Sequence, residues 1–208
     1  MSKFKLVCAA LVAFLPFNWL RVWGYRLFFG YQIEGAKIGW GTILGVTSAR
    51  LGRCQIGYLN QFVGPMTLTI ADGVKIGDQN RFVCGFWTLE HGQEYARCLT
   101  IGENARITSS HYFDVCGALE IGAGSWIAGI GSQFWTHGAG IARRYVKIGK
   151  DCYLGSAVCF GPGAVIEDGV MVALGSVVTR KFAGNHLLLG GAPASVVMSH
   201  YDWKSRQG

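Results

Sequence analysis

The stretch Val146-Lys-Ile-Gly-Lys-Asp-Cys-Tyr-Leu-Gly-Ser-Ala-Val-Cys-Phe-Gly-Pro-Gly-Ala-Val-Ile-Glu-Asp-Gly-Val-Met-Val-Ala-Leu-Gly-Ser-Val-Val-Thr-Arg180 repeats itself every six residues. Each unit begins with a large apolar residue, and a small or β-branched residue follows four positions later. The large positions are Ile148, Leu154, Phe160, Ile166 and Val172, and the small ones are Cys152, Val158, Ala164, Val170 and Ser176. Such a unit is too short for a helix pair and does not follow the two-residue alternation of an ordinary strand. The period predicts an all-β solenoid of short strands and corners.

The repeat also predicts how the strands stack. Three units make one turn of a triangular prism, so residues 18 positions apart lie one above the other. Stacked strands pair through their backbones at about 4.8 Å per turn. The expected pairs are Ile148 with Ile166, Leu154 with Val172 and Phe160 with Val178.

The same register continues upstream with four interruptions. The spacings Ile56 to Ile70, Ile76 to Ile101, Ile107 to Ile121 and Ile127 to Ile148 exceed multiples of six by 2, 1, 2 and 3 residues. We expect the extra residues to form bulges or loops that leave the prism. Functional sites in repeat proteins favour the places where the repeat is broken.

One elongated domain accounts for nearly all of the 208 residues. We expect an N-terminal segment over 1–32, the β-helix over 33–190 and a C-terminal tail over 191–208. Phe4 to Phe29 is interpreted as one or two short amphipathic helices around Pro16. These helices would cap the open end of the prism. The alternative is that they also rest on a membrane surface through Phe14, Phe17, Trp19, Trp23, Phe28 and Phe29, flanked by Arg21 and Arg26.

Charge and cysteine content narrow the partners and the compartment. The formal net charge of +7 favours anionic partners. Nucleic acid is not expected, because the chain has no Lys/Arg run, aromatic RNA-binding signature or basic helix. Phosphorylated cofactors or an anionic membrane surface explain the charge better.

The seven cysteines have no metal-ligand spacing and indicate buried thiols in a reducing cytoplasm, with the inner face of the cytoplasmic membrane as a further possible location.

Three motifs carry a resemblance to a known family. Val146–Val158 and Val172–Arg180 resemble the last two coils of the hexapeptide-repeat acyltransferases, and Gly190–Val197 resembles their closing motif. Among these enzymes the chain is most similar to bacterial polysaccharide and lipopolysaccharide O-acetyltransferases and to maltose and galactoside acetyltransferases. The resemblance implies a left-handed parallel β-helix and a homotrimer. It also implies acetyl-CoA as co-substrate in a groove between copies, a sugar or lipid-linked saccharide as acceptor, and no metal.

Transfer of an acyl group to a hydroxyl needs a base, and histidine suits this role near neutral pH. Thr136-His137 resembles the catalytic histidine motif of the family and stands directly before the break at residues 139–145. His137 is therefore the expected general base. We expect His111 to bind substrate or assist His137, and Asp114 to orient the imidazole. His91 lies in the irregular segment 85–95, which could reach over the acceptor.

The cofactor residues follow from the same resemblance. Ser156 and Leu174, one coil apart, align with the residues whose backbones line the pantetheine arm. Thr179 and Arg180 would meet the nucleotide end, and Lys181 adds charge near the phosphates.

Two other functions fit a β-solenoid. The γ-class carbonic anhydrases share the left-handed β-helix and bind zinc through three histidines, and His91, His111 and His137 are three in number. A His-x4-His pair is missing, which argues against this reading. The second alternative is a scaffold without catalysis, in which His137 could be replaced without loss of activity.

Overall fold

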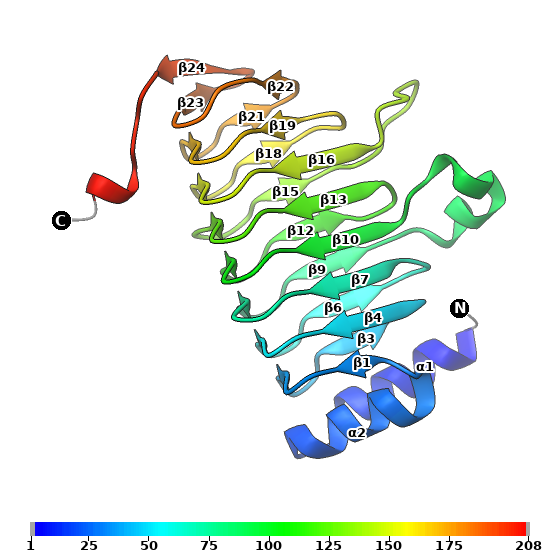
Figure 1. Cartoon of the computed structure of the whole chain (residues 1–208). Coiled ribbons are helices and arrows are strands. Elements are labelled where there is room, and N and C mark those ends of the chain that lie inside the picture. Colours follow the sequence, from blue (N-terminus) through cyan, green and yellow to red (C-terminus); the bar gives the residue numbers. More distant parts are fainter. Residues whose placement is uncertain (1–2, 207–208) are drawn as a thin grey trace.

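The computed structural model describes residues 3–206 as a prism of parallel strands, with two helices at one end and a hairpin at the other (Figure 1). The prism has three faces, each a single sheet, and the chain visits the faces in turn. Sheet A contains β1 (Gln32–Ile33), β4 (Ser48–Leu51), β7 (Thr67–Ile70), β10 (Cys98–Ile101), β13 (Ala118–Ile121), β16 (Tyr145–Ile148), β19 (Val165–Ile166) and β22 (Lys181–Phe182). The predicted left-handed parallel β-helix is confirmed.

The other two faces are built in the same way. Sheet B contains β2 (Lys37–Ile38), β5 (Gln55–Ile56), β8 (Lys75–Ile76), β11 (Arg106–Ile107), β14 (Trp126–Ile127), β17 (Tyr153–Leu154), β20 (Met171–Val172), β23 (Leu188–Gly191) and β24 (Ala194–Met198). Sheet C contains β3 (Ile43–Gly45), β6 (Gln61–Val63), β9 (Arg81–Val83), β12 (Tyr112–Asp114), β15 (Gln133–Phe134), β18 (Cys159–Phe160) and β21 (Val177–Val178).

The register agrees with the six-residue period. The three predicted stacked pairs occur: Ile148 with Ile166, Leu154 with Val172, and Phe160 with Val178. Sheet C also carries a column of five buried phenylalanines on its inner side, with neighbouring ring centroids 4.4, 4.2, 4.8 and 5.3 Å apart. The column consists of Phe62, Phe82, Phe113, Phe134 and Phe160. The interior of the prism is therefore filled by side chains.

Two of the expected interruptions are loops that leave the prism on the same side (Figure 1). The first contains the 3-10 segment η1 (Phe86–Glu94) between β9 and β10, and the second spans residues 135–144 between β15 and β16. The loops touch each other. Arg144 pairs with Glu94 at 3.3 Å, and its guanidinium lies 4.6 Å from the ring centroid of Tyr95. Chain segments from two breaks thus meet at one place.

The ends of the prism are covered by different elements. Helices α1 (Lys3–Ala13) and α2 (Asn18–Phe29) flank Pro16 and lie across the first coil, where the Tyr25 hydroxyl bonds the carbonyl of Thr42 at 2.9 Å. No helix in residues 3–206 is long and apolar enough to cross a bilayer. At the other end β24 folds back antiparallel on β23. This hairpin crosses the expected boundary at residue 190, because sheet B continues to Met198 before the tail with η2 (Lys204–Arg206) begins.

Candidate active site

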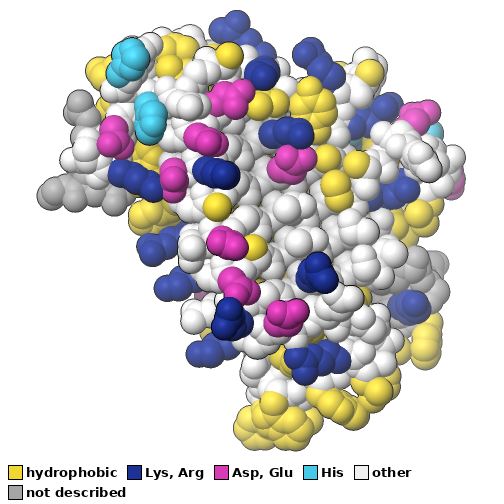
Figure 2. All heavy atoms as spheres, viewed as in Figure 1, with side chains coloured by type: hydrophobic (Ala, Val, Ile, Leu, Met, Phe, Trp, Pro, Cys, Tyr) yellow, Lys and Arg dark blue, Asp and Glu magenta, His cyan; other side chains and the backbone are white. Residues whose placement is uncertain are grey.

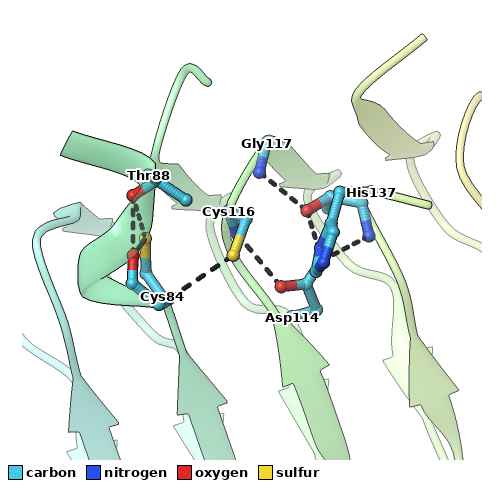
Figure 3. Close-up of polar contacts among 8 residues, drawn as sticks. Cys84, Thr88, Asp114, Cys116, Gly117 and His137 are labelled. Carbon is cyan, nitrogen blue, oxygen red and sulfur yellow. Dashed lines mark hydrogen bonds and ion pairs between the residues drawn. The ribbon is translucent and has the colours of Figure 1, made fainter. Parts of the chain in front are cut away.

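The expected base and its expected partner lie side by side on neighbouring coils. Asp114 ends β12, and His137 follows β15, which pairs with β12 in sheet C. After β15 the chain turns toward the next corner, and this turn carries His137 over Asp114 (Figure 3). The imidazole Nδ1 lies 2.7 Å from Asp114 Oδ2. The Asp114 side chain is 3% exposed, whereas that of His137 is 30% exposed.

The carboxylate of Asp114 is held by several donors. Oδ2 accepts hydrogen bonds from the backbone N–H and the hydroxyl of Thr136, each at 2.8 Å, and Oδ1 accepts one from the N–H of Cys116 at 3.3 Å. The Thr136 hydroxyl is fixed in turn by the N–H of Gly117 at 2.7 Å. An ionised carboxylate can only accept, so His137 Nδ1 is the donor. The free lone pair of the neutral ring is therefore on Nε2, which faces away from Asp114.

Aromatic side chains from the η1 loop cover one side of His137. The Trp87 ring centroid lies 5.3 Å and that of Tyr95 6.3 Å from the imidazole centroid. His91 packs against both aromatic residues, at 5.6 Å from Trp87 and 5.7 Å from Tyr95. The sequence indicated a loop over the acceptor at this break but did not identify Trp87 or Tyr95. These rings border the imidazole on one side, and the rest of the His137 side chain stays accessible.

His111 lies inside a corner of the coil and bonds the backbone. Its Nδ1 accepts the N–H of Ser132 at 3.1 Å, and its Nε2 lies 3.0 Å from the hydroxyl of Thr108. Burial lowers the pKa of His111 to about 4, so the ring is neutral at pH 7. The residue is one step of a ladder in which a polar side chain accepts the backbone N–H of the equivalent residue on the next coil. The acceptors are Thr42, Asn60, Asn80 and His111, and the ladder ends at the N–H of Ser132. These contacts favour a structural role over the expected one in substrate binding.

Comparisons with known proteins agree with this architecture. Neither a family model nor a curated protein sequence matches the chain. The solved structure of the polysialic acid O-acetyltransferase OatWY matches with a TM-score of 0.66 at 19% identity, over 83% of this chain and 86% of that chain. This chain has the fold of the hexapeptide-repeat acyltransferases. A maltose O-acetyltransferase from Clostridium difficile 630 is 27% identical over 62% of this chain and 70% of its own, with a TM-score of 0.44.

The residues expected to bind the cofactor lie at two different corners of the prism, one between sheets B and C and one between sheets C and A. Ser156 follows β17 and Leu174 follows β20, so both stand where the chain passes from sheet B to sheet C. They stack, since the N–H of Gly175 donates to the Ser156 carbonyl at 2.9 Å. Thr179 and Arg180 follow β21 and stand at the passage from sheet C to sheet A. His137 lies at this second corner, two coils away from Thr179 and Arg180.

The basic residues of the last coil have partners of their own. Arg180 lies over the ring of Phe182, 4.9 Å from its centroid, and Lys181 pairs with Glu167 at 3.3 Å. Arg180 and Lys181 are both exposed, although Phe182 is buried, and an exposed ion pair such as Lys181 with Glu167 is weak. The two cations are therefore able to exchange these partners for a phosphate.

The imidazole of His137 and two neighbouring side chains form a group of three potential metal ligands. Donor atoms of Asp114, Cys116 and His137 lie within 4.8 Å of one another. Oδ2 of Asp114 already accepts three hydrogen bonds. The pKa of the Cys116 thiol is raised by its hydrogen bond with the Cys84 sulfur and by burial, which opposes the thiolate that a metal needs. The donor set therefore fits a hydrogen-bonded carboxylate–imidazole pair better than a metal.

The three histidines of the carbonic anhydrase alternative are used differently from one another. His111 holds the corner ladder through both ring nitrogens, whereas His91 and His137 lie with the rings of the η1 loop. A common zinc ion would require His111 to give up at least one of these bonds, because a metal binds through one ring nitrogen. The arrangement gives this alternative no support.

Proposed function

We propose that the protein is an O-acyltransferase that moves an acetyl group from acetyl-CoA to a sugar hydroxyl in the synthesis of a surface polysaccharide or lipopolysaccharide. The observation that carries the proposal is the pair of His137 and Asp114, which are hydrogen-bonded through Nδ1 so that Nε2 is left for the substrate, with the rings of Trp87 and Tyr95 beside the imidazole. The fold shared with the polysialic acid O-acetyltransferase supports the same chemistry.

The reaction needs only groups that this pair can supply. His137 Nε2 takes the proton of the acceptor hydroxyl while the oxygen forms a bond to the thioester carbonyl carbon. The tetrahedral intermediate then collapses, the carbon–sulfur bond breaks, and the leaving thiolate of coenzyme A takes the proton from the imidazolium. Asp114 stays ionised throughout and stabilises the imidazolium through Nδ1–H. Both substrates are bound together, and no covalent enzyme intermediate is needed.

The division of the cofactor residues supports a shared site. His137 lies at one corner of the prism, whereas Ser156 and Leu174 lie at another, with the whole width of sheet C between them. In a homotrimer, the corner with Leu174 on one copy would face the corner with His137 on the next. The pantetheine arm would then lie between two copies, and its thioester would reach the imidazole.

The trimer has a direct test in solution. Sedimentation equilibrium of the purified protein is expected to give three times the chain mass of 22.6 kDa. The physical reason is that neither corner alone holds both the base and the arm. A monomer at concentrations where the enzyme turns over would contradict the shared site.

The activity itself is tested by thiol release. We expect free coenzyme A to appear when the protein is given acetyl-CoA together with an acceptor from a panel of sugars and undecaprenyl-linked oligosaccharides. The expected product carries one new ester per thiol released, which mass spectrometry can count. Thiol release without acceptor would indicate simple hydrolysis. Absence of ester with every acceptor, from protein that binds acetyl-CoA, would favour the scaffold alternative.

A further inference from the structure

Helices α1 and α2 expose an apolar surface at one end of the molecule. Trp19 is 66% exposed and Trp23 is 55% exposed, and seven other large apolar side chains of these helices and their connection are also exposed. The set, called here the apolar face, consists of Phe4, Val7, Leu11, Phe14, Phe17, Trp19, Trp23, Leu27 and Phe28. Figure 2 shows hydrophobic side chains gathered at this end.

Helical spacing places most of these residues away from the prism. Trp19, Trp23 and Leu27 follow one another at intervals of four, and the exposed residues of α1 recur at intervals of three and four. Each helix thus has two different sides. The side toward the prism buries Ala9, Val12 and Tyr25. Capping the first coil explains the buried side. Phe14 also packs against Trp40, with ring centroids 4.8 Å apart, but every residue of the apolar face stays exposed.

The same region is cationic. The sequence has no Asp or Glu before Glu34, whereas α1 and α2 contain Lys5 and Arg26 among their exposed residues. A groove of about 750 Å³ begins at α2, runs along sheet B and is lined by four cations and one acid. These are Arg21, Lys37, Lys75, Arg106 and Asp78. The helices that carry the apolar face thus have exposed positive charge and no carboxylate.

Two residues expected at a membrane surface have other roles. The guanidinium of Arg21 is buried and donates to the carbonyl of Ile38 at 3.0 and 2.8 Å and to that of Leu15 at 2.5 Å. Phe29 is half-buried and stacks on Tyr31 with ring centroids 5.4 Å apart. Arg21 and Phe29 hold the helices to the first coil, and the buried guanidinium of Arg21 cannot flank a lipid surface as expected. The apolar face consists of the remaining residues.

We propose that the apolar face rests on the surface of an anionic lipid bilayer and inserts its side chains at the boundary of headgroups and acyl chains. Tryptophan suits this depth, because its ring is apolar and its N–H can reach water. Positive charge and no carboxylate on the same helices complement anionic lipid. A second copy of the chain is a poorer occupant, since two such faces would bring cations together.

A trimer strengthens this contact. Parallel prisms around a threefold axis present all three apolar faces at the same end of the assembly. Three linked contacts bind a surface far more tightly than one, without any new interaction. Three such contacts would attach the assembly stably, although no single helix is long enough to span the bilayer.

If the proposed function holds, on which this step rests, the contact with the membrane also determines which class of acceptor can reach His137. His137 follows β15, four strands above β3 in sheet C, so it stands about 19 Å above the first coil. The helices add about 10 Å and would be embedded by about 5 to 10 Å. The imidazole is then about 20 to 25 Å above the membrane surface. A saccharide linked to a lipid, with its reactive hydroxyl at that height, is the acceptor class that fits.

Vesicle binding tests the proposal without any assay of acyl transfer. The full-length protein is centrifuged with vesicles of phosphatidylcholine alone or mixed with phosphatidylglycerol. We expect it to sediment with the mixed vesicles and to be released by high salt. The Trp19→Ser/Trp23→Ser variant is expected to bind about tenfold more weakly or worse. The matched control is Val196→Ser/Val197→Ser, which removes exposed apolar side chains from β24 at the opposite end and should bind normally.

Three outcomes would overturn the proposal. Wild-type protein could remain in the supernatant with the mixed vesicles, or Trp19→Ser/Trp23→Ser could bind as wild type does. The third outcome is a smaller assembly for Trp19→Ser/Trp23→Ser than for wild type in the absence of lipid, which would assign the apolar face to self-association. Transfer to a water-soluble sugar should be equal in wild type and this variant. A failure of acyl transfer in every protein would contradict the proposed function and leave the membrane contact standing.

Discussion

Replacing His137 with alanine is expected to lower kcat for acyl transfer by about 10² to 10⁴. Without the imidazole, the acceptor hydroxyl keeps its proton as it attacks the thioester, and a neutral alcohol is a poor nucleophile. The side chain is 30% exposed and fills no core position, so the fold should be retained. Thiol release measures the rate, and calorimetric titration with coenzyme A measures binding. We expect coenzyme A to bind the variant about as tightly as wild type.

Asp114→Asn separates orientation of the imidazole from its presence. The amide cannot accept from His137 and both groups of Thr136 as the carboxylate does, so the ring loses its fixed tautomer. We expect kcat to fall by at least about tenfold while KM for acetyl-CoA changes little. A merely structural role would instead lower the folded fraction and leave kcat per folded molecule unchanged. Full turnover of His137→Ala would refute the base, and full turnover of Asp114→Asn would refute the orienting role.

The regular part of the fold could be predicted because one period governs it. Residues 146–180 contain nearly two uninterrupted turns, and every stacked pair expected there is present. Upstream, the isoleucines of sheets A and B could be recognised, and Phe62, Phe82 and Phe113 of sheet C stand six residues after Ile56, Ile76 and Ile107. Extra residues follow sheet C in several coils, as after Phe82 and Phe134, so the spacing across that corner varies. Beyond that corner the six-residue count breaks, so the path of the loops could not be predicted from the period.

The site was predictable to the extent that short motifs determine it. Thr136-His137 and a nearby carboxylate could be named from the sequence, because one lies in a motif and the other on the preceding coil. The aromatic residues beside His137, Trp87 and Tyr95, could not be predicted. The path of the η1 loop depends on contacts such as the ion pair of Arg144 with Glu94, which are 50 positions apart in the sequence. His111 shows the converse. A histidine looks functional in a sequence, yet here its ring replaces an asparagine in a ladder of backbone bonds.

Replacing Phe113 with alanine is expected to lower the free energy of unfolding by about 3 to 5 kcal/mol. Phe113 is fully buried at the centre of the phenylalanine column, 4.2 Å from the Phe82 ring and 4.8 Å from the Phe134 ring, and nearly parallel to both. Removing it leaves a cavity between two rings that the neighbouring coils hold apart. Backbone pairing of β12 with β9 and β15 fixes that separation, so the rings cannot close the gap.

Urea unfolding followed by circular dichroism measures the loss, with Val197→Ala as a surface control expected to change stability by less than about 0.5 kcal/mol. Phe113→Leu should lose less than Phe113→Ala, because it leaves a smaller cavity. Asp114 directly follows Phe113, so a cavity at this level should also loosen the carboxylate that holds His137. We therefore expect Phe113→Ala to lose turnover at temperatures where it is still folded. A loss of stability below about 1 kcal/mol would mean that the coils can collapse onto the cavity. In that case the phenylalanine column would not set the distance between the coils that carry Asp114 and His137.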